Sequence, residues 1–148
     1  MTGEVRILPV PGVPEIRPGD DLAALLFQAM VTGGLELRDG DVLAVTQKVV
    51  SKAEGRVVPE GRGGKAAWVA REARRIVARR GDLVIAETRH GFVCANAGVD
   101  ASNVAEGFLT LLPEDPDASA ERLRSVLTAA TGASAGVVIT DTFGRAWR

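Results

Sequence analysis

The 148-residue chain has one cysteine, one histidine and almost no net charge, and these low numbers exclude several kinds of site and partner. Cys94 has no second cysteine with which to form a disulfide within the chain, which favours a reducing compartment. His90 and Cys94 are single residues of their types, so neither belongs to a metal cluster with ligand spacing. We expect His90 to lie in a turn and Cys94 to be a small core residue.

Charge and hydrophobic runs give no argument for a nucleic-acid or membrane partner. The net charge is −1 and the pI is about 5.9, so no strong basic field is present. No apolar stretch approaches the roughly 20 residues of a membrane span. Met1 is followed by Thr2, Gly3 and Glu4, without the basic start and apolar core of a signal peptide. We therefore expect a cytoplasmic protein with no nucleic-acid and no membrane partner.

The common nucleotide-binding fingerprints are also missing. The chain has neither G-x-x-x-x-G-K-[ST] nor G-x-G-x-x-G between a strand and a helix. The segment 61–65 superficially resembles a phosphate loop, but Ala66 stands where a hydroxyl residue would follow Lys65 and no apolar strand precedes it. We interpret residues 61–64 as a flexible tip, with Lys65 at the start of a helix. The basic run 71–80 also contains Glu72, and we interpret it as a solvated helix face.

Hydrophobic periodicity predicts a mixture of helices and strands with no repeat and no linker. With 46% hydrophobic residues the chain can bury one core, and we expect one domain or part of one. Because the elements lack a βαβ rhythm, we predict an α+β fold, with a mixed sheet and flanking helices. The pattern predicts strands at 5–10, 42–50, 55–59, 83–87, 91–96 and 137–139, helices at 22–30, 65–80 and 115–130, and no clear element at 103–112.

Two acidic motifs lie after apolar, strand-like runs. Gly-Val-Asp-Ala-Ser-Asn at 98–103 contains Asp100 and Asn103, and Ile-Thr-Asp-Thr-Phe-Gly-Arg at 139–145 contains Asp141 and Thr142. Either aspartate alone could simply cap a turn or a helix. Together, hard oxygen ligands with Arg145 nearby suit Mg²⁺ or Mn²⁺ phosphate chemistry. Lys52, at the end of the run 42–50, could contact a phosphate or could be a solvated strand end.

These motifs, taken with several others in order along the chain, resemble the coenzyme F420-0:L-glutamate ligase family (the CofE type, also found as the N-terminal domain of FbiB proteins). The segments that carry the resemblance are 8–15, 18–22, 40–42, 49–56, 96–103 and 140–148. The family continues beyond the Thr-Asp-Thr motif into further elements and ligand residues. The resemblance therefore covers the N-terminal portion of a CofE-like ligase domain, 1–148, and implies a truncated or naturally shortened member.

The resemblance implies a GTP-dependent ligase that joins the phospholactate carboxylate of F420-0, a deazaflavin, to L-glutamate through an acyl phosphate and then adds γ-linked glutamates. It implies two divalent cations, Mg²⁺ or Mn²⁺, with K⁺ as a further candidate ion, GTP as co-substrate, and a homodimer. Alternatives are an inactive nucleotide- and metal-binding remnant, or another metal-dependent phosphoryl-transfer enzyme acting on a different carboxylate.

Individual residues acquire roles by the same resemblance. Asp100 and Asp141 match the family's metal ligands, and Thr142 matches a ligand of the second metal. The residues that match its nucleotide contacts are Val13, Pro14, Glu15, Ile16, Lys52 and Asn103. Gln47 occupies a position where the family often has serine, and we expect it to hydrogen-bond the nucleotide. No catalytic acid or base is assigned.

Overall fold

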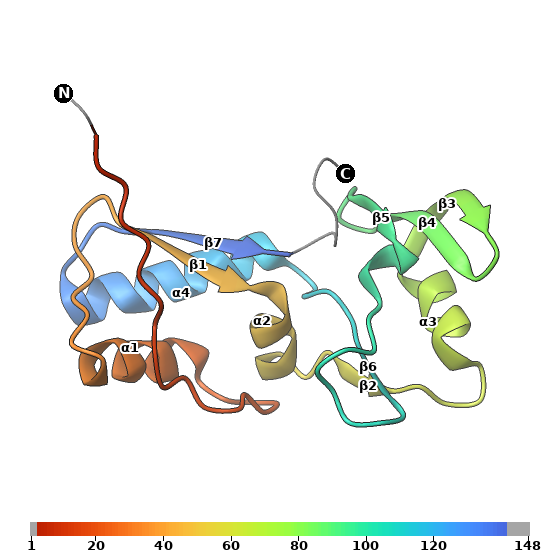
Figure 1. Ribbon diagram of the computed structural model, residues 1–148, viewed down its shortest axis with the longest axis horizontal. Helices are drawn as coiled ribbons and strands as arrows, with labels where there is room; N and C mark the ends of the chain where they lie inside the picture. The colour runs from red at the N-terminus through yellow and green to blue at the C-terminus, as the bar shows by residue number, and fades with distance from the viewer. Residues whose placement is uncertain (1–2, 142–148) are drawn as a thin grey trace.

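The computed structural model describes residues 3–141 of the chain. Its elements form two lobes, which lie at opposite ends of the molecule in Figure 1. The first lobe comprises α1 (Leu22–Thr32), β1 (Val42–Thr46), α2 (Gln47–Ala53), α4 (Pro116–Thr131) and β7 (Gly136–Thr140). The second lobe comprises β2 (Val57–Pro59), α3 (Gly64–Glu72), β3 (Ala73–Arg80), β4 (Leu83–Thr88), β5 (Val93–Ala95), the 3₁₀ turn η1 (Asn96–Gly98) and β6 (Phe108–Thr110). The predicted α+β class is confirmed.

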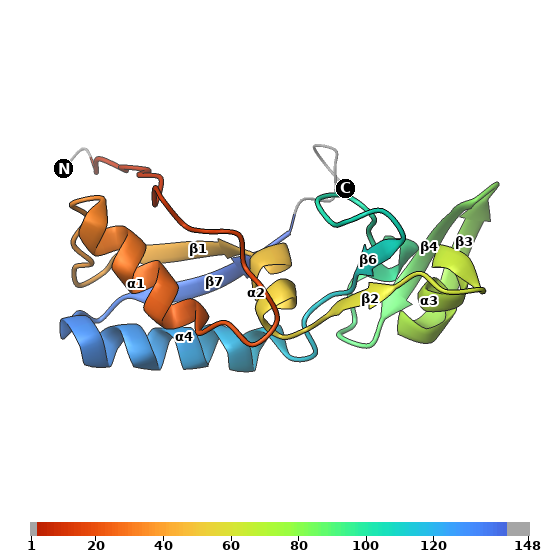
Figure 2. The same cartoon turned by 90° about the horizontal axis from the view of Figure 1, so that it is seen from below.

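The strands form three small sheets. In the first lobe β1 and β7 pair in parallel, from Val42 opposite Gly136 to Thr46 opposite Thr140. The second lobe contains the antiparallel sheet β3-β4-β5 and the antiparallel pair β2-β6. A parallel pair needs a crossover connection, and here the whole second lobe and α4 lie between the two strands in sequence. Figure 2 shows β1 and β7 side by side above α4.

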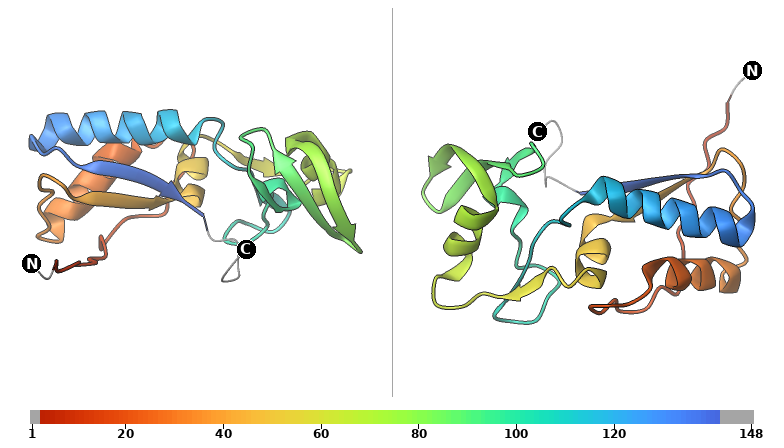
Figure 3. Two further views of the ribbon diagram at one scale, coloured as in Figure 1. Left: turned by 90° about the horizontal axis from the view of Figure 1, so that it is seen from above. Right: turned by 180° about the vertical axis from the view of Figure 1, so that it is seen from behind.

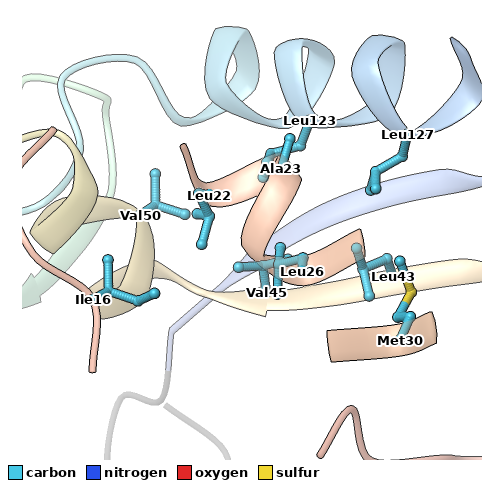
Figure 4. Packing of buried hydrophobic residues seen from close by; sticks show 10 residues of the cluster. All are labelled: Ile16, Leu22, Ala23, Leu26, Met30, Leu43, Val45, Val50, Leu123 and Leu127. Atoms are coloured by element: carbon cyan, nitrogen blue, oxygen red, sulfur yellow. The ribbon is translucent and has the colours of Figure 1, made fainter. Parts of the chain in front are cut away.

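The first lobe has a hydrophobic core between its helices and the β1-β7 sheet (Figure 4). Helix α1 contributes Leu22, Leu26 and Met30, which recur at helical spacing and are buried. Strand β1 contributes Leu43 and Val45, and α4 contributes Leu123 and Leu127. Ile16, from the Pro-rich segment before α1, and Val50 of α2 complete one end of this core. The start of α2 and the segment around Ile16 are thereby fixed to the lobe.

The second lobe has its own hydrophobic cluster. It contains Val69, Val84, Ala86, Ala97, Val99, Leu109 and Leu111, all buried. Leu109 and Leu111 are 1% exposed, so this cluster is closed to solvent. Two hydrophobic clusters therefore stabilise the described part of the chain, where the composition predicted one.

The predicted helices at 22–30 and 115–130 are confirmed, with the capping chemistry that the sequence indicates. Asp21 caps α1 by accepting a hydrogen bond from the Ala24 backbone N–H at 3.1 Å. Asp115 caps α4 in the same way through Ala118 at 2.9 Å. Gly132 ends α4 in the left-handed conformation, with φ of 74°. None of the helices among residues 3–141 is long and apolar enough to cross a membrane.

The prediction of a single helix over 65–80 is wrong beyond Glu72. The chain is helical only over Gly64–Glu72, and β3 then pairs antiparallel with β4. Gly81 is the first residue of the two-residue turn of this hairpin, because Arg80 pairs with Leu83. Glu87 of β4 accepts hydrogen bonds from Arg74 and Arg75 across the pair. Tertiary pairing therefore overrides the helical spacing of the apolar residues.

The continuous strand predicted at 42–50 is wrong in its second half, where α2 begins at Gln47. Gln47, Val50 and Ser51 are buried at helical spacing, and the Ser51 hydroxyl donates to Gln47 Oε1 at 3.0 Å. The predicted strand at 5–10 is also absent, since this segment is extended with no strand partner. Val5 and Ile7 are 85% and 90% exposed. The short strand near 55–59, the hairpin of 83–87 with 91–96, and the last strand at 137–139 are confirmed as β2, β4-β5 and β7.

Candidate functional site

Asp100 follows a strained turn that separates it from β5. Three successive residues, Asn96, Ala97 and Gly98, have positive φ angles of 52°, 51° and 76°. Such a conformation is costly for Ala97, and it persists only where packing holds it. A Cβ on Gly98 would lie 2.5 Å from Leu112 Cγ, so glycine is required there. The backbone of Asp100 then pairs with Thr110, the last residue of β6, which fixes the carboxylate beside α2.

The Asp100 carboxylate is held by two neighbouring groups. Lys48 Nζ, from the first turn of α2, forms an ion pair with Asp100 Oδ2. The Ser102 hydroxyl donates to the same oxygen, and Lys48 also donates to Ser102. Partial burial raises the pKa of Asp100. The hydrogen bonds from Lys48 and Ser102, together with the positive charge of Lys48, lower it by more, so that the pKa is about 2. Asp100 is therefore an ionised carboxylate at neutral pH.

Asp141 comes directly after β7, at the edge of the sheet where α2 begins. Because β1 and β7 are parallel and in register, Thr46 lies opposite Thr140 and both chains leave the sheet at the same edge. Burial raises the pKa of the Cys94 thiol, and the negative charge of Asp141 raises it further. Asp141 therefore lies within electrostatic reach of Cys94, and the prediction that this cysteine is buried is confirmed.

Both acidic motifs contribute to one pocket of about 320 Å³, hereafter the carboxylate pocket. The residues around it include Asp100, Asp141, Ser102, Gln47, Lys48, Lys65 and Cys94. The two predicted metal ligands that the structure describes are thus brought together. Thr142 and Arg145 lie outside the described residues. In Figure 3 strand β7 points from the first lobe toward the second.

Four of the predicted nucleotide contacts line a second pocket of about 440 Å³, hereafter the nucleotide pocket. They are Glu15, Ile16, Lys52 and Asn103. Lys52 Nζ forms an ion pair with Glu15 Oε1 at 2.5 Å. Val13 packs against the core of the first lobe, and neither Val13 nor Pro14 lines the nucleotide pocket. The nucleotide pocket therefore contains four of the residues predicted to contact the nucleotide, but not Val13 or Pro14.

Three residues that the sequence did not select line the carboxylate pocket. Lys48 precedes Lys52 by four residues on α2, so the two lysines lie on one face of the helix. Ser102 belongs to the acidic motif, where only Asp100 and Asn103 were selected. Lys65 follows the glycine-rich residues 61–64 and was predicted only as the start of a helix. Helical spacing could have identified Lys48, whereas only the tertiary fold brings Lys65 to this pocket.

The donor set of the carboxylate pocket fits a hard divalent cation. Among residues 3–141 no group of three His, Cys, Asp or Glu side chains forms a metal cluster. Two carboxylates and the Ser102 hydroxyl are nevertheless the oxygen ligands that Mg²⁺ accepts, and Mg²⁺ completes its shell with water and substrate phosphates. Lys48 pairs with the Asp100 carboxylate. A bound cation would share that carboxylate with the lysine.

Comparison with known proteins agrees with the motifs. Residues 12–148 match the family described as F420-0:Gamma-glutamyl ligase. The chain is 41% identical to the coenzyme F420:L-glutamate ligase of Methanothermobacter thermautotrophicus, covering 97% of this chain and 64% of that protein. It is 45% identical to the enzyme of the same name from Methanopyrus kandleri, covering 97% and 62%. The chain spans a little under two thirds of the length of these relatives. The chain belongs to the F420-0:gamma-glutamyl ligase family.

Proposed function

We propose that this chain forms the nucleotide- and metal-binding part of a GTP-dependent ligase of coenzyme F420 biosynthesis. The ligase joins the phospholactate carboxylate of F420-0 to the amine of L-glutamate and then adds γ-linked glutamates. The observation that carries the proposal is the meeting of Asp100, Asp141 and Lys48 in one pocket, next to the pocket of Lys52 and Asn103. The names of the relatives support the ligase assignment.

A carboxylate is a poor electrophile, so amide formation requires activation. In the proposed reaction a carboxylate oxygen of F420-0 attacks the γ-phosphorus of GTP, the bond from that phosphorus to the β-γ bridging oxygen breaks, and GDP leaves. The glutamate amine then attacks the acyl carbon, the bond to phosphate breaks, and the amine loses a proton. The products are an amide, GDP and inorganic phosphate. The enzyme contributes mainly positioning and charge stabilisation.

The residues of this chain have distinct tasks in that reaction. Lys52 and Lys48 lie on one face of α2, where two ammonium groups can bind the phosphates of the nucleotide. Asn103 and Glu15 border the pocket that would take the rest of the nucleotide. Asp100 and Asp141 would hold Mg²⁺ or Mn²⁺, with Thr142 at a second metal. A metal held by these residues would supply positive charge to neutralise the phosphates.

Three further properties are part of the proposal. The assembled enzyme is a homodimer, and K⁺ is a candidate additional ion. Gln47 is buried with its Oε1 accepting from Ser51, so its amide nitrogen has donors to offer in the carboxylate pocket. We assign Gln47 to the phosphate side of the nucleotide.

The proposal is tested by thermal unfolding of the chain with GTP, Mn²⁺, both, or neither. A ligand that binds only the folded state raises the unfolding temperature, so GTP with Mn²⁺ should stabilise the chain more than either alone. Asp100→Asn and Asp141→Asn should each abolish the metal-dependent part of this rise in the unfolding temperature. Asp82→Asn, in the exposed β3-β4 turn, is the matched control and should retain it.

Turnover is then tested with F420-0 and L-glutamate, comparing GTP with ATP, and the glutamylated product is measured by mass. Product that depends on GTP and metal supports the full proposal. Metal-dependent GTP binding without product would show that this chain binds but does not ligate. If GTP gives no metal-dependent stabilisation, the site assignment is wrong.

A further inference from the structure

A third pocket, also of about 320 Å³, adjoins the carboxylate pocket, and none of the residues so far given a role is confined to it. The two pockets share Gln47, Cys94 and Asp141. The other residues that line this third pocket are mainly apolar and include Phe92, Leu112, Pro113, Ala120, Val138 and Ile139. Small-molecule pockets typically have volumes of about 300–1,000 Å³ and apolar walls with a few polar groups. This apolar pocket therefore has the character of a ligand site.

We propose that the apolar pocket binds the planar aromatic ring of the acceptor substrate. The inference rests on the proposed function, and it adds to it the site that selects the acceptor. The proposed reaction needs a substrate with a large aromatic ring and a carboxylate that reaches the γ-phosphate. An apolar pocket that ends at Asp141 provides a place for the ring beside the carboxylate pocket.

The order of the three pockets along α2 supports this assignment. Lys52, near the C-terminal end of the helix, borders the nucleotide pocket. Lys48, one helical turn earlier, borders the carboxylate pocket. Gln47, the first residue of α2, borders both the carboxylate pocket and the apolar pocket. The carboxylate pocket thus lies between the other two, where a phosphoryl group would pass from the nucleotide to an acceptor.

His90 gives the apolar pocket a polar group with unused hydrogen-bonding capacity. Its Nε2 lies 2.9 Å from the carbonyl oxygen of Glu114, which can only accept, so Nε2 carries the proton of that bond. Nδ1 is buried and has no hydrogen-bond partner among the described residues. A buried polar atom without a partner is costly.

The test is to fill the pocket and measure acceptor binding directly. Ala120→Phe on α4 places a ring in the pocket, and Val138→Phe on β7 does so from a side chain that is 43% exposed, where the fold tolerates a larger residue. Ala129→Phe, on an exposed position of α4, is the matched control. Binding of F420-0 is measured by equilibrium dialysis, GTP binding with Mn²⁺ by thermal shift, and the folded state by circular dichroism.

The inference predicts that both filling variants weaken F420-0 binding by roughly tenfold or more, because the ring and the new side chain cannot share the space. GTP binding should stay within about twofold, and Ala129→Phe should bind F420-0 as the unchanged chain does. If folded Val138→Phe and Ala120→Phe bind F420-0 as tightly as the control, or the unchanged chain does not bind it, the inference is wrong. Loss of F420-0 binding in the filled variants supports the inference even if no glutamylated product forms. The absence of glutamylated product would count only against the proposed ligase function.

Discussion

Lys48 Nζ forms an ion pair with the carboxylate of Asp100, which joins the first turn of α2 to the loop that follows η1. This contact connects the two lobes, because α2 belongs to the first and the Asp100 loop to the second. It also keeps a negatively charged oxygen beside Asp141 in the carboxylate pocket. Fold and candidate site therefore depend on the same pair of residues.

The first prediction concerns pH. The pKa of Asp100 is lowered to about 2 from an ordinary value of 3.8, so its ionised form stabilises the folded state above about pH 4. That contribution is lost as the pH falls through about 4 to 2. At pH 7, Asp100→Asn should lower the free energy of unfolding by about 1 kcal/mol or less, because the side chain is 38% exposed and solvent screens the pair.

Urea unfolding of the two proteins at several pH values between 7 and 2 checks this. The difference between Asp100→Asn and the unchanged chain should shrink through that window and vanish at its lower end. Asp82→Asn, on the exposed turn, is the control and should show no such pH-dependent difference. A difference for Asp100→Asn that is the same at pH 7 and pH 2 would contradict the ion pair as the source of the low pKa.

The second prediction concerns the turn before Asp100. Gly98→Ala should lower the free energy of unfolding by about 2–4 kcal/mol, since the new Cβ meets the Leu112 side chain and the residue has a positive φ. Gly81→Ala is a matched control, because Gly81 has φ of 56° but open space around its Cβ position. It should cost only about 1 kcal/mol of backbone strain. Equal losses in urea unfolding would show that the contact with Leu112 is unimportant.

The third prediction concerns the charge network around Glu72, the last residue of α3 in the second lobe. Glu72 accepts hydrogen bonds from Arg56 and Arg89, each at 2.9 Å, and its side chain is 9% exposed. Glu72→Gln should destabilise the fold by about 3 kcal/mol, because the part-buried Arg56 guanidinium loses its buried counter-charge and keeps only the exposed Glu114. Glu87→Gln breaks the pairs with the exposed Arg74 and Arg75 and serves as control, with a much smaller loss expected. Similar urea midpoints for the two variants would argue against a special role for the Glu72 network.

Local signals in the sequence were enough for the capped helices and the site motifs. Asp21 and Asp115 cap α1 and α4, and Gly132 ends α4. Asp100 and Asp141 follow apolar runs that pack in the fold, and the parallel pairing of β1 with β7 brings Asp141 to the edge where α2 begins. Oxygen-rich motifs after apolar runs therefore pointed to residues that line the carboxylate pocket.

The remaining features depend on long-range packing that a single sequence does not encode locally. Ile76 and Val77 have helical spacing with Val69, yet they lie in β3 because β4 offers hydrogen-bond partners and Glu87 pairs with the arginines. The apolar run through Val50 reads as one strand, yet burial of Gln47 and Ser51 at helical spacing makes its second half α2. Lys65 reaches the carboxylate pocket only because α3 packs beside η1.

The most direct test of the account is Mn²⁺ binding in the presence of GTP, measured by electron paramagnetic resonance of free Mn²⁺. The account holds that Asp100 and Asp141 act at one metal and phosphate site in the carboxylate pocket. It predicts that Asp100→Asn and Asp141→Asn each weaken Mn²⁺ binding by roughly tenfold or more, while Asp82→Asn binds Mn²⁺ as the unchanged chain does. Undiminished Mn²⁺ binding by either folded Asp100→Asn or folded Asp141→Asn would contradict it.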